Sequence, residues 1–125
     1  MYSDQVLDHF LHPRYVGELG EEAEVVEGSN PACGDVLKLW AVVRDGVLVE
    51  ATFKASGCVA AVACGSWLTE NIRGRPLSQL TGMPPDHLEA ELGGLPPGSR
   101  HAAVLASDVL KRLLSRLLYG AGHQR

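Results

Sequence analysis

The sequence contains no long apolar run. The longest unbroken apolar stretch covers only residues 58–64, whereas a membrane-spanning helix needs roughly 20 apolar residues. The first twelve residues contain acids and histidines where a secretory leader would have a basic start and an apolar core. We therefore expect no membrane segment and a cytoplasmic protein.

The chain also lacks an excess of basic residues. It has 11 lysines and arginines against 15 acids, for a formal net charge of −4. This balance argues against a nucleic-acid partner, because counterion release requires a basic surface. Residues 18–27 are strongly acidic and residues 100–125 are mostly basic. The basic part either complements a helix dipole or forms a docking face for an acidic partner.

Repeats, low-complexity tracts and linkers are absent from the 125 residues. We therefore expect one domain spanning residues 1–125. A chain of this length can bury about two-thirds of the surface exposed when it is unfolded, so its core needs neither disulfides nor a structural metal. Any bound metal would then serve chemistry.

Cysteine is scarce: there are three residues, Cys33, Cys58 and Cys64. An odd number cannot pair completely, and a sparse set without a leader indicates a reducing compartment in which thiols stay free. The cysteines are therefore the first candidates for chemistry.

The local patterns predict an α+β fold with a small antiparallel sheet of two or three strands packed against helices. Ser3 is expected to cap a short helix that ends before Pro13. Residues 23–27 are a candidate edge strand. A helix is predicted over residues 59–73, where Gly65 would permit close packing on the sheet. One or two short helices follow, and Ser99 is expected to cap a long helix with an apolar stripe.

Asp45-Gly46 separates two runs rich in β-branched residues, 36–44 and 47–55, and predicts a hairpin with a two-residue type I′ turn. In the register of that turn, Glu50, Thr52 and Lys54 share the outer face. The core face would carry Trp40, Val42, Val49, Ala51 and Phe53. Extended to the open end, the register places Asp35 opposite Ser56 and Cys33 opposite Cys58. Two thiols and a carboxylate would then meet at one end of the sheet.

The candidate site residues are Cys33, Asp35, Cys58 and His101, all at element ends. A helix N-terminus after Cys58 would lower its thiol pKa, and the start of the last helix would keep His101 neutral. Two thiolates, one carboxylate and one imidazole form a ligand set suited to zinc or iron. The competing interpretation treats Cys33 and Cys58 as small buried hydrophobes, which is also our expectation for Cys64.

Two segments at a characteristic separation, Asn30-Pro31-Ala32-Cys33-Gly34-Asp35 and Gly57-Cys58, resemble the U-type iron–sulfur cluster assembly scaffold family. This family is represented by IscU, SufU and the N-terminal domain of NifU, and the resemblance covers nearly the whole chain. Further matching residues are Tyr2, Val6 to Phe10, Pro13-Arg14, Gly17, Phe53-Lys54, Ser66, Thr69-Glu70, Leu95 to Pro97, His101 and Leu105-Ala106.

The resemblance implies a scaffold or carrier, not an enzyme, on which a [2Fe–2S] cluster is assembled from iron and from sulfur supplied by a cysteine desulfurase. The cluster would then pass to acceptor proteins, and the same pocket binds zinc in the family. Cys33, Asp35 and Cys58 match ligand positions, and His101 matches the histidine beside the family's third cysteine. Ala102 stands at the position of that third cysteine.

Two alternatives remain open at this point. The first is a zinc-binding sulfur acceptor or regulator of a desulfurase that builds no cluster. The second is a thiol enzyme that uses Cys33 or Cys58 with His101 as base.

Gly98-Ser99 follows Leu95-Pro96-Pro97 where chaperone-recognised members carry Val-Lys, which leaves an Hsp70-type chaperone partner in doubt. A monomer and a homodimer are both compatible with the sequence.

Overall fold

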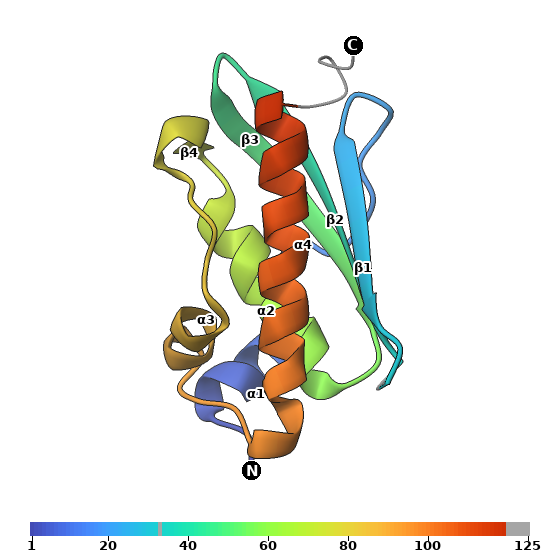
Figure 1. Ribbon diagram of the computed structural model, residues 1–125, viewed down its shortest axis with the longest axis vertical. Helices are drawn as coiled ribbons and strands as arrows, with labels where there is room; N and C mark the ends of the chain where they lie inside the picture. The colour runs from blue at the N-terminus through green and yellow to red at the C-terminus, as the bar shows by residue number, and fades with distance from the viewer. Residues whose placement is uncertain (33, 120–125) are drawn as a thin grey trace.

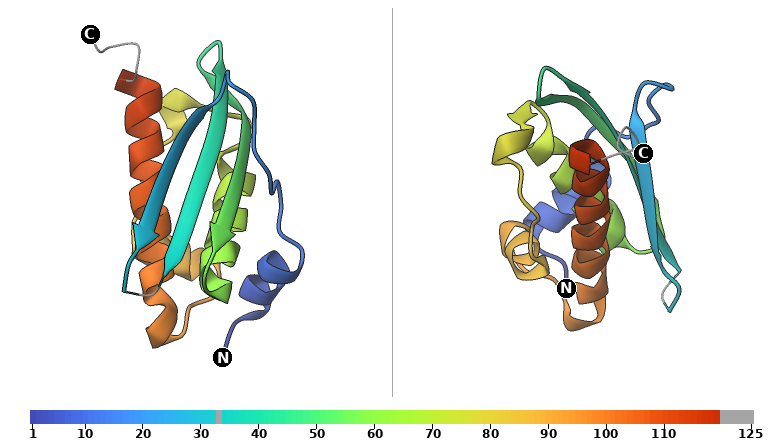
Figure 2. Two further views of the ribbon diagram at one scale, coloured as in Figure 1. Left: turned by 90° about the vertical axis from the view of Figure 1, so that its right-hand side faces the viewer. Right: turned by 45° about the horizontal axis from the view of Figure 1, so that its top comes forward.

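A computed structural model describes residues 1–32 and 34–119 of the chain, so Cys33 and residues 120–125 lie outside the described part. Figure 1 shows the arrangement of its helices and strands. The sheet is antiparallel with the strand order β1-β2-β3-β4. The long helices α2 and α4 cover one face of the sheet, and no helix of the described residues covers the opposite face (Figure 2). The predicted α+β class is confirmed, with one strand more than expected.

The elements follow the predicted order. The helices are α1 Asp4–Leu11, α2 Val59–Ile72, α3 Pro85–Glu91 and α4 Arg100–Tyr119; the strands are β1 Glu24–Asn30, β2 Asp35–Arg44, β3 Val47–Ser56 and β4 Arg75–Pro76. The hydroxyl of Ser3 accepts a hydrogen bond from the Val6 N–H at 3.0 Å, which confirms the predicted cap. Strand β4 was not predicted, because two residues are too few to show an alternating pattern.

The hairpin turn is confirmed, but the predicted register is wrong beyond its first pairs. Asp45 and Gly46 both have positive φ, as a type I′ turn requires. A β-bulge between Val42 and Val43 then shifts the pairing by one residue, so that Val36, not Asp35, lies opposite Ser56.

The bulge also changes which residues of β2 face the helices. The core contains Leu37, Leu39 and Ala41, together with Ala51 and Phe53 of β3. Trp40 lies opposite Thr52, so the prediction that it faces the core is wrong. The same correction applies to Val42, which alternates with the core residues of β2, and to Val49, which is only half-buried.

Helix α2 packs very closely on the sheet. A Cβ on Gly65 would lie 2.6 Å from the Phe53 ring and 3.0 Å from Leu37 Cδ1. Only a residue without a side chain fits here, which confirms the predicted role of this glycine. The close contact at Gly65 holds helix α2, whose N-cap is Cys58, against Leu37 of β2 and Phe53 of β3.

Helix α4 has the predicted apolar stripe. Ala102, Leu105, Ala106, Val109 and Leu113 are buried, and Leu117 is half-buried. The predicted capping role of Ser99 is wrong: this residue ends a 3-10 turn, Pro97–Ser99, that leads into α4, and its hydroxyl lies 3.4 Å from the Tyr2 hydroxyl instead of bonding to a helix N–H. The stripe presses the helix onto β1 and β2 and so fixes the position of its first turn.

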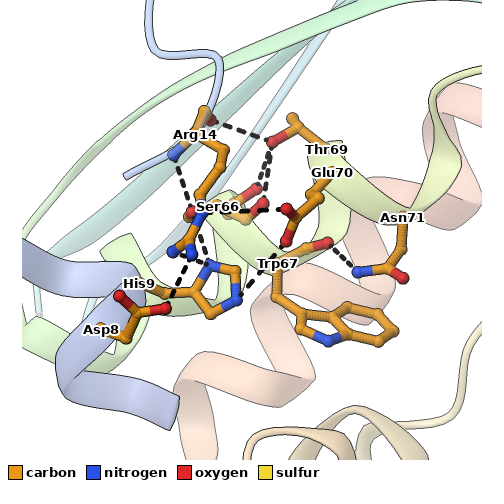
Figure 3. A network of polar contacts seen from close by, with 9 residues as sticks. Asp8, His9, Arg14, Ser66, Trp67, Thr69, Glu70 and Asn71 are labelled. Atoms are coloured by element: carbon orange, nitrogen blue, oxygen red, sulfur yellow. Dashed lines mark hydrogen bonds and ion pairs between the residues drawn. The ribbon is translucent and has the colours of Figure 1, made fainter. Parts of the chain in front are cut away.

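A polar network fastens helix α1 to helix α2 (Figure 3). The imidazole Nδ1 of His9 lies 2.7 Å from Ser66 Oγ, which also accepts a hydrogen bond from the Arg14 N–H at 2.9 Å. The Arg14 guanidinium donates to Asp8 at 2.7 Å. The buried hydroxyl of Thr69 donates to the Arg14 carbonyl at 3.4 Å. This network was not predicted from the sequence.

Acids of the segment 18–27 form ion pairs with basic side chains of α4 and of the hairpin. Glu24 pairs with Arg116 of α4 at 3.1 Å, and Arg112 donates to the Glu27 carbonyl at 2.8 Å. Two further acids of the same segment pair with the hairpin, Glu18 with Lys54 and Glu22 with Arg44. Among the described helices, none is long and apolar enough to cross a membrane.

Candidate metal centre

Three predicted site residues meet at one end of the molecule. Asp35 is the first residue of β2, Cys58 is the N-cap of α2, and His101 lies in the first turn of α4. Cys58 Sγ lies 3.4 Å from Asp35 Oδ2 and 3.9 Å from His101 Nε2. The His101 Nε2 and Asp35 Oδ2 atoms are 2.9 Å apart. One donor atom from each of these side chains therefore faces a common point.

The loop before α2 brings Cys58 to Asp35. Gly57 has a φ of +116°, and a Cβ there would lie 2.8 Å from Asp35 Cα. This close approach lets the Cys58 N–H donate to Asp35 Oδ1 at 2.9 Å. The carboxylate is fully buried, and a buried charge needs such partners to offset its lost hydration.

The spacing of the three donors fits a tetrahedral metal ion. Bonds of about 2.3 Å to sulfur and about 2.0 Å to nitrogen or oxygen place ligand atoms roughly 3.5 Å apart for S···N or S···O and roughly 3.3 Å apart for N···O. The observed separations of 3.4, 3.9 and 2.9 Å lie within about 0.5 Å of these values. A small rearrangement would bring all three side chains to one ion.

The predicted lowering of the Cys58 pKa is wrong. Burial raises the pKa of this thiol, and the neighbouring Asp35 carboxylate raises it further. The N–H groups of Ala61 and Ala60 at the start of α2 act in the predicted direction, but their effect is smaller than that of burial. Without a metal, Cys58 is therefore a thiol that donates to Asp35, and a bound cation would have to displace its proton.

The remaining sequence candidates fall outside this cluster. Cys33 lies outside the described residues, so its predicted position opposite Cys58 is not tested. Cys64 is fully buried in the hydrophobic core, as predicted. Ala102 is buried next to His101, and its methyl side chain cannot bind a metal ion.

A hollow of about 270 Å³ adjoins His101 on its outer side. It lies between the end of β1 and helix α4, and it is lined mainly by apolar atoms. Val104, one helical turn beyond His101, is 47% exposed at its edge. The imidazole side of the site is thus open to an approaching molecule, while the carboxylate side is closed.

The fold and these donors together define a small α+β domain with a mixed thiol, carboxylate and imidazole centre. Residues 1–119 match the model of the NifU-like N-terminal domain family. The chain therefore belongs to this family, and the recognition from sequence is confirmed.

Characterised relatives are similar over most of the chain. The iron–sulfur cluster assembly scaffold protein IscU of Escherichia coli K12 is 39% identical over 119 residues, which cover 91% of each chain. IscU 1 of Archaeoglobus fulgidus is 37% identical over 114 residues, covering 91% of this chain and 74% of the relative.

Solved structures share the fold. A proposed SUF-system scaffold protein from Fervidobacterium islandicum AW-1 has a TM-score of 0.70 at 20% identity and covers 90% of this chain and 96% of that protein. A NifU-like N-terminal domain from Brucella abortus has a TM-score of 0.61 at 20% identity, covering 91% of this chain and 80% of that one.

Proposed function

We propose that this protein is a scaffold or carrier for iron–sulfur cluster assembly. The observation that carries the proposal is the convergence of the Asp35, Cys58 and His101 donors in a member of the NifU-like N-terminal domain family. Relatives 37–40% identical over most of the chain are named as cluster assembly scaffolds. The iron and the [2Fe–2S] cluster would be cargo, received and released at this site.

Each ligand has a distinct role in this proposal. Cys58 supplies a thiolate, the ligand type that holds iron–sulfur clusters. His101 supplies an imidazole from the open side, and Asp35 supplies a carboxylate, a more labile ligand suited to a site that must release its cargo. Cys33 is the fourth proposed ligand, and its assignment rests on the sequence pattern alone. A cysteine desulfurase would deliver sulfur past His101, and acceptor proteins would receive the cluster.

Anaerobic reconstitution with iron and sulfide tests this proposal through a matched pair of variants. The parent protein is expected to develop the visible absorption of a [2Fe–2S] cluster. Cys58→Ala should lose that absorption, whereas Cys64→Ala, which removes a buried thiol in the same helix, should keep it. An unchanged spectrum in Cys58→Ala would remove Cys58 from the site.

Ala102 favours a second candidate function. Because it replaces a donor found in the family, the chain would hold a single zinc ion more readily than a cluster, as a sulfur acceptor or regulator of a desulfurase. Metal and acid-labile sulfide analysis of protein purified without oxygen separates the two functions. Zinc near one per chain, with no sulfide after reconstitution, would support the second function and contradict the first.

The contacts of Cys58 disfavour a thiol enzyme. Its pKa is raised, and His101 Nε2 lies closer to Asp35 than to the sulfur. A nucleophilic cysteine needs the opposite arrangement, with a lowered pKa and a base directed at the thiol. We accordingly propose a binding protein and no catalytic residue.

A further inference from the structure

A second cavity lies far from the metal centre. It has a volume of about 250 Å³, is partly open to solvent, and is lined by the C-terminal half of α2, residues 75–83, helix α3 and the middle of α4. Cys58 caps the first turn of α2, whereas Asn71 lines the cavity from its last turn, about 20 Å away at 1.5 Å per residue. The cavity therefore belongs to a different part of the molecule from the donors already described.

Two unpaired cations border this cavity. Among the lysines and arginines of residues 1–32 and 34–119, only Arg75 and Lys111 make no side-chain hydrogen bond, ion pair or aromatic contact. Arg75 lines the cavity. Lys111 Cγ would lie 3.6 Å from a Cβ on Gly82, which stands between two lining residues. Among the described lysines and arginines, the two without an internal partner thus belong to this part of the molecule, although the chain as a whole is acidic.

The residues that line the cavity also supply hydrogen-bond donors and a flat apolar surface. Within the described residues, no hydrogen bond engages the side chains of Gln79 and Thr81 or the indole N–H of Trp67. Figure 3 shows the Trp67 indole beside Asn71 and outside the network around His9. Leu80 and Met83 supply apolar wall. The lining carboxylate, Glu91, lies 3.9 Å from His87, another lining residue.

We propose that this cavity binds a small organic anion, a carboxylate or phosphate carried on a flat apolar body. Arg75 pairs with the anionic group through its planar guanidinium, and Lys111 adds a second positive charge. The apolar body stacks against the Trp67 indole. The volume equals that of about eight waters, which is enough for a ligand of roughly the size of phenyl phosphate.

NMR titration of the full chain with phenyl phosphate tests the proposal. The protein has two tryptophans, so its two indole N–H resonances can be assigned and followed separately. The Trp67 indole N–H and the backbone of residues 79–82 are expected to shift in a saturable way, while the Trp40 indole stays in place. Inorganic phosphate should bind about tenfold more weakly, because it lacks the stacking group.

Two arginine variants provide the matched comparison. Arg75→Ala should weaken phenyl phosphate binding about tenfold. Arg112 lies outside the cavity and makes no ion pair, so Arg112→Ala should leave binding unchanged. Absence of a saturable Trp67 shift, or equal weakening by both variants, would overturn the proposal. Zinc loading should be normal in Arg75→Ala, so this result is independent of the proposed scaffold function.

Discussion

At the residue scale, two cysteines six positions apart have opposite environments. Cys58 is half-buried and its sulfur contacts a carboxylate and an imidazole. Cys64 is fully buried among apolar side chains, and this burial raises its pKa to about 12. The sequence predicted correctly that Cys64 packs in the core, because it lies inside an apolar helix, whereas Cys58 marks the start of that helix.

Alkylation of the folded, metal-free protein by iodoacetamide should distinguish these two thiols. The raised pKa reduces the thiolate fraction of Cys64 about a thousandfold at neutral pH, and burial blocks access as well. Peptide mass spectrometry is expected to show label on Cys58 long before Cys64, and zinc should protect Cys58. Equal labelling of the two residues in folded protein would contradict the described core.

At the element scale, the attachment of α1 depends on one buried hydroxyl. Ser66 Oγ is the partner of both His9 Nδ1 and the Arg14 N–H. The sequence patterns indicated the helix and its cap but not this attachment. A lone histidine or serine gives no periodic signal, and its partner lies more than 50 residues away in the chain.

Ser66→Ala is expected to destabilise the fold by about 1–3 kcal/mol, because it leaves the part-buried Arg14 N–H without a partner and removes the nearest partner of the buried His9 Nδ1. Urea denaturation measures the change in the free energy of unfolding. The control is Ser115→Ala, at an exposed position of α4, which should change it by less than about 0.5 kcal/mol. Similar values for the two variants would show that the Ser66 contacts contribute little.

The same network should make stability depend on pH. Burial lowers the pKa of His9, and the positive charge of Arg14 lowers it further, while Glu70 and Asp8 oppose this shift. The unfolded chain therefore takes up the proton first, and the contribution of neutral His9, fully present above the unfolded pKa of about 6.5, is lost as pH falls from that value through the lower folded pKa.

Comparison of the parent with His9→Asn isolates this contribution. Between about pH 7.5 and pH 5.5, the parent should lose more unfolding free energy than the variant. His12→Asn changes an exposed histidine next to the same helix and should behave like the parent. Identical pH dependence in the parent and His9→Asn would contradict a role for His9 titration.

At the scale of the whole molecule, the sheet and the two long helices bring three distant segments to one end. The α+β class, the order of the elements and the convergence of Asp35, Cys58 and His101 were predictable from turn chemistry, helix boundaries and the family resemblance. The strand register was not. A single bulge between Val42 and Val43 reverses the faces of β2, and nothing in a run of β-branched residues reveals where a bulge occurs.

We propose that Asp35, Cys58 and His101 bind one metal ion together. X-ray absorption at the zinc edge, on protein loaded with one zinc per chain, reports the ligands of that ion. The parent should show sulfur ligands at about 2.3 Å together with nitrogen or oxygen ligands at about 2.0 Å. Cys58→Ala should lose one sulfur and Cys64→Ala none. An equal number of sulfur ligands in Cys58→Ala and the parent would show that Cys58 does not bind the metal ion.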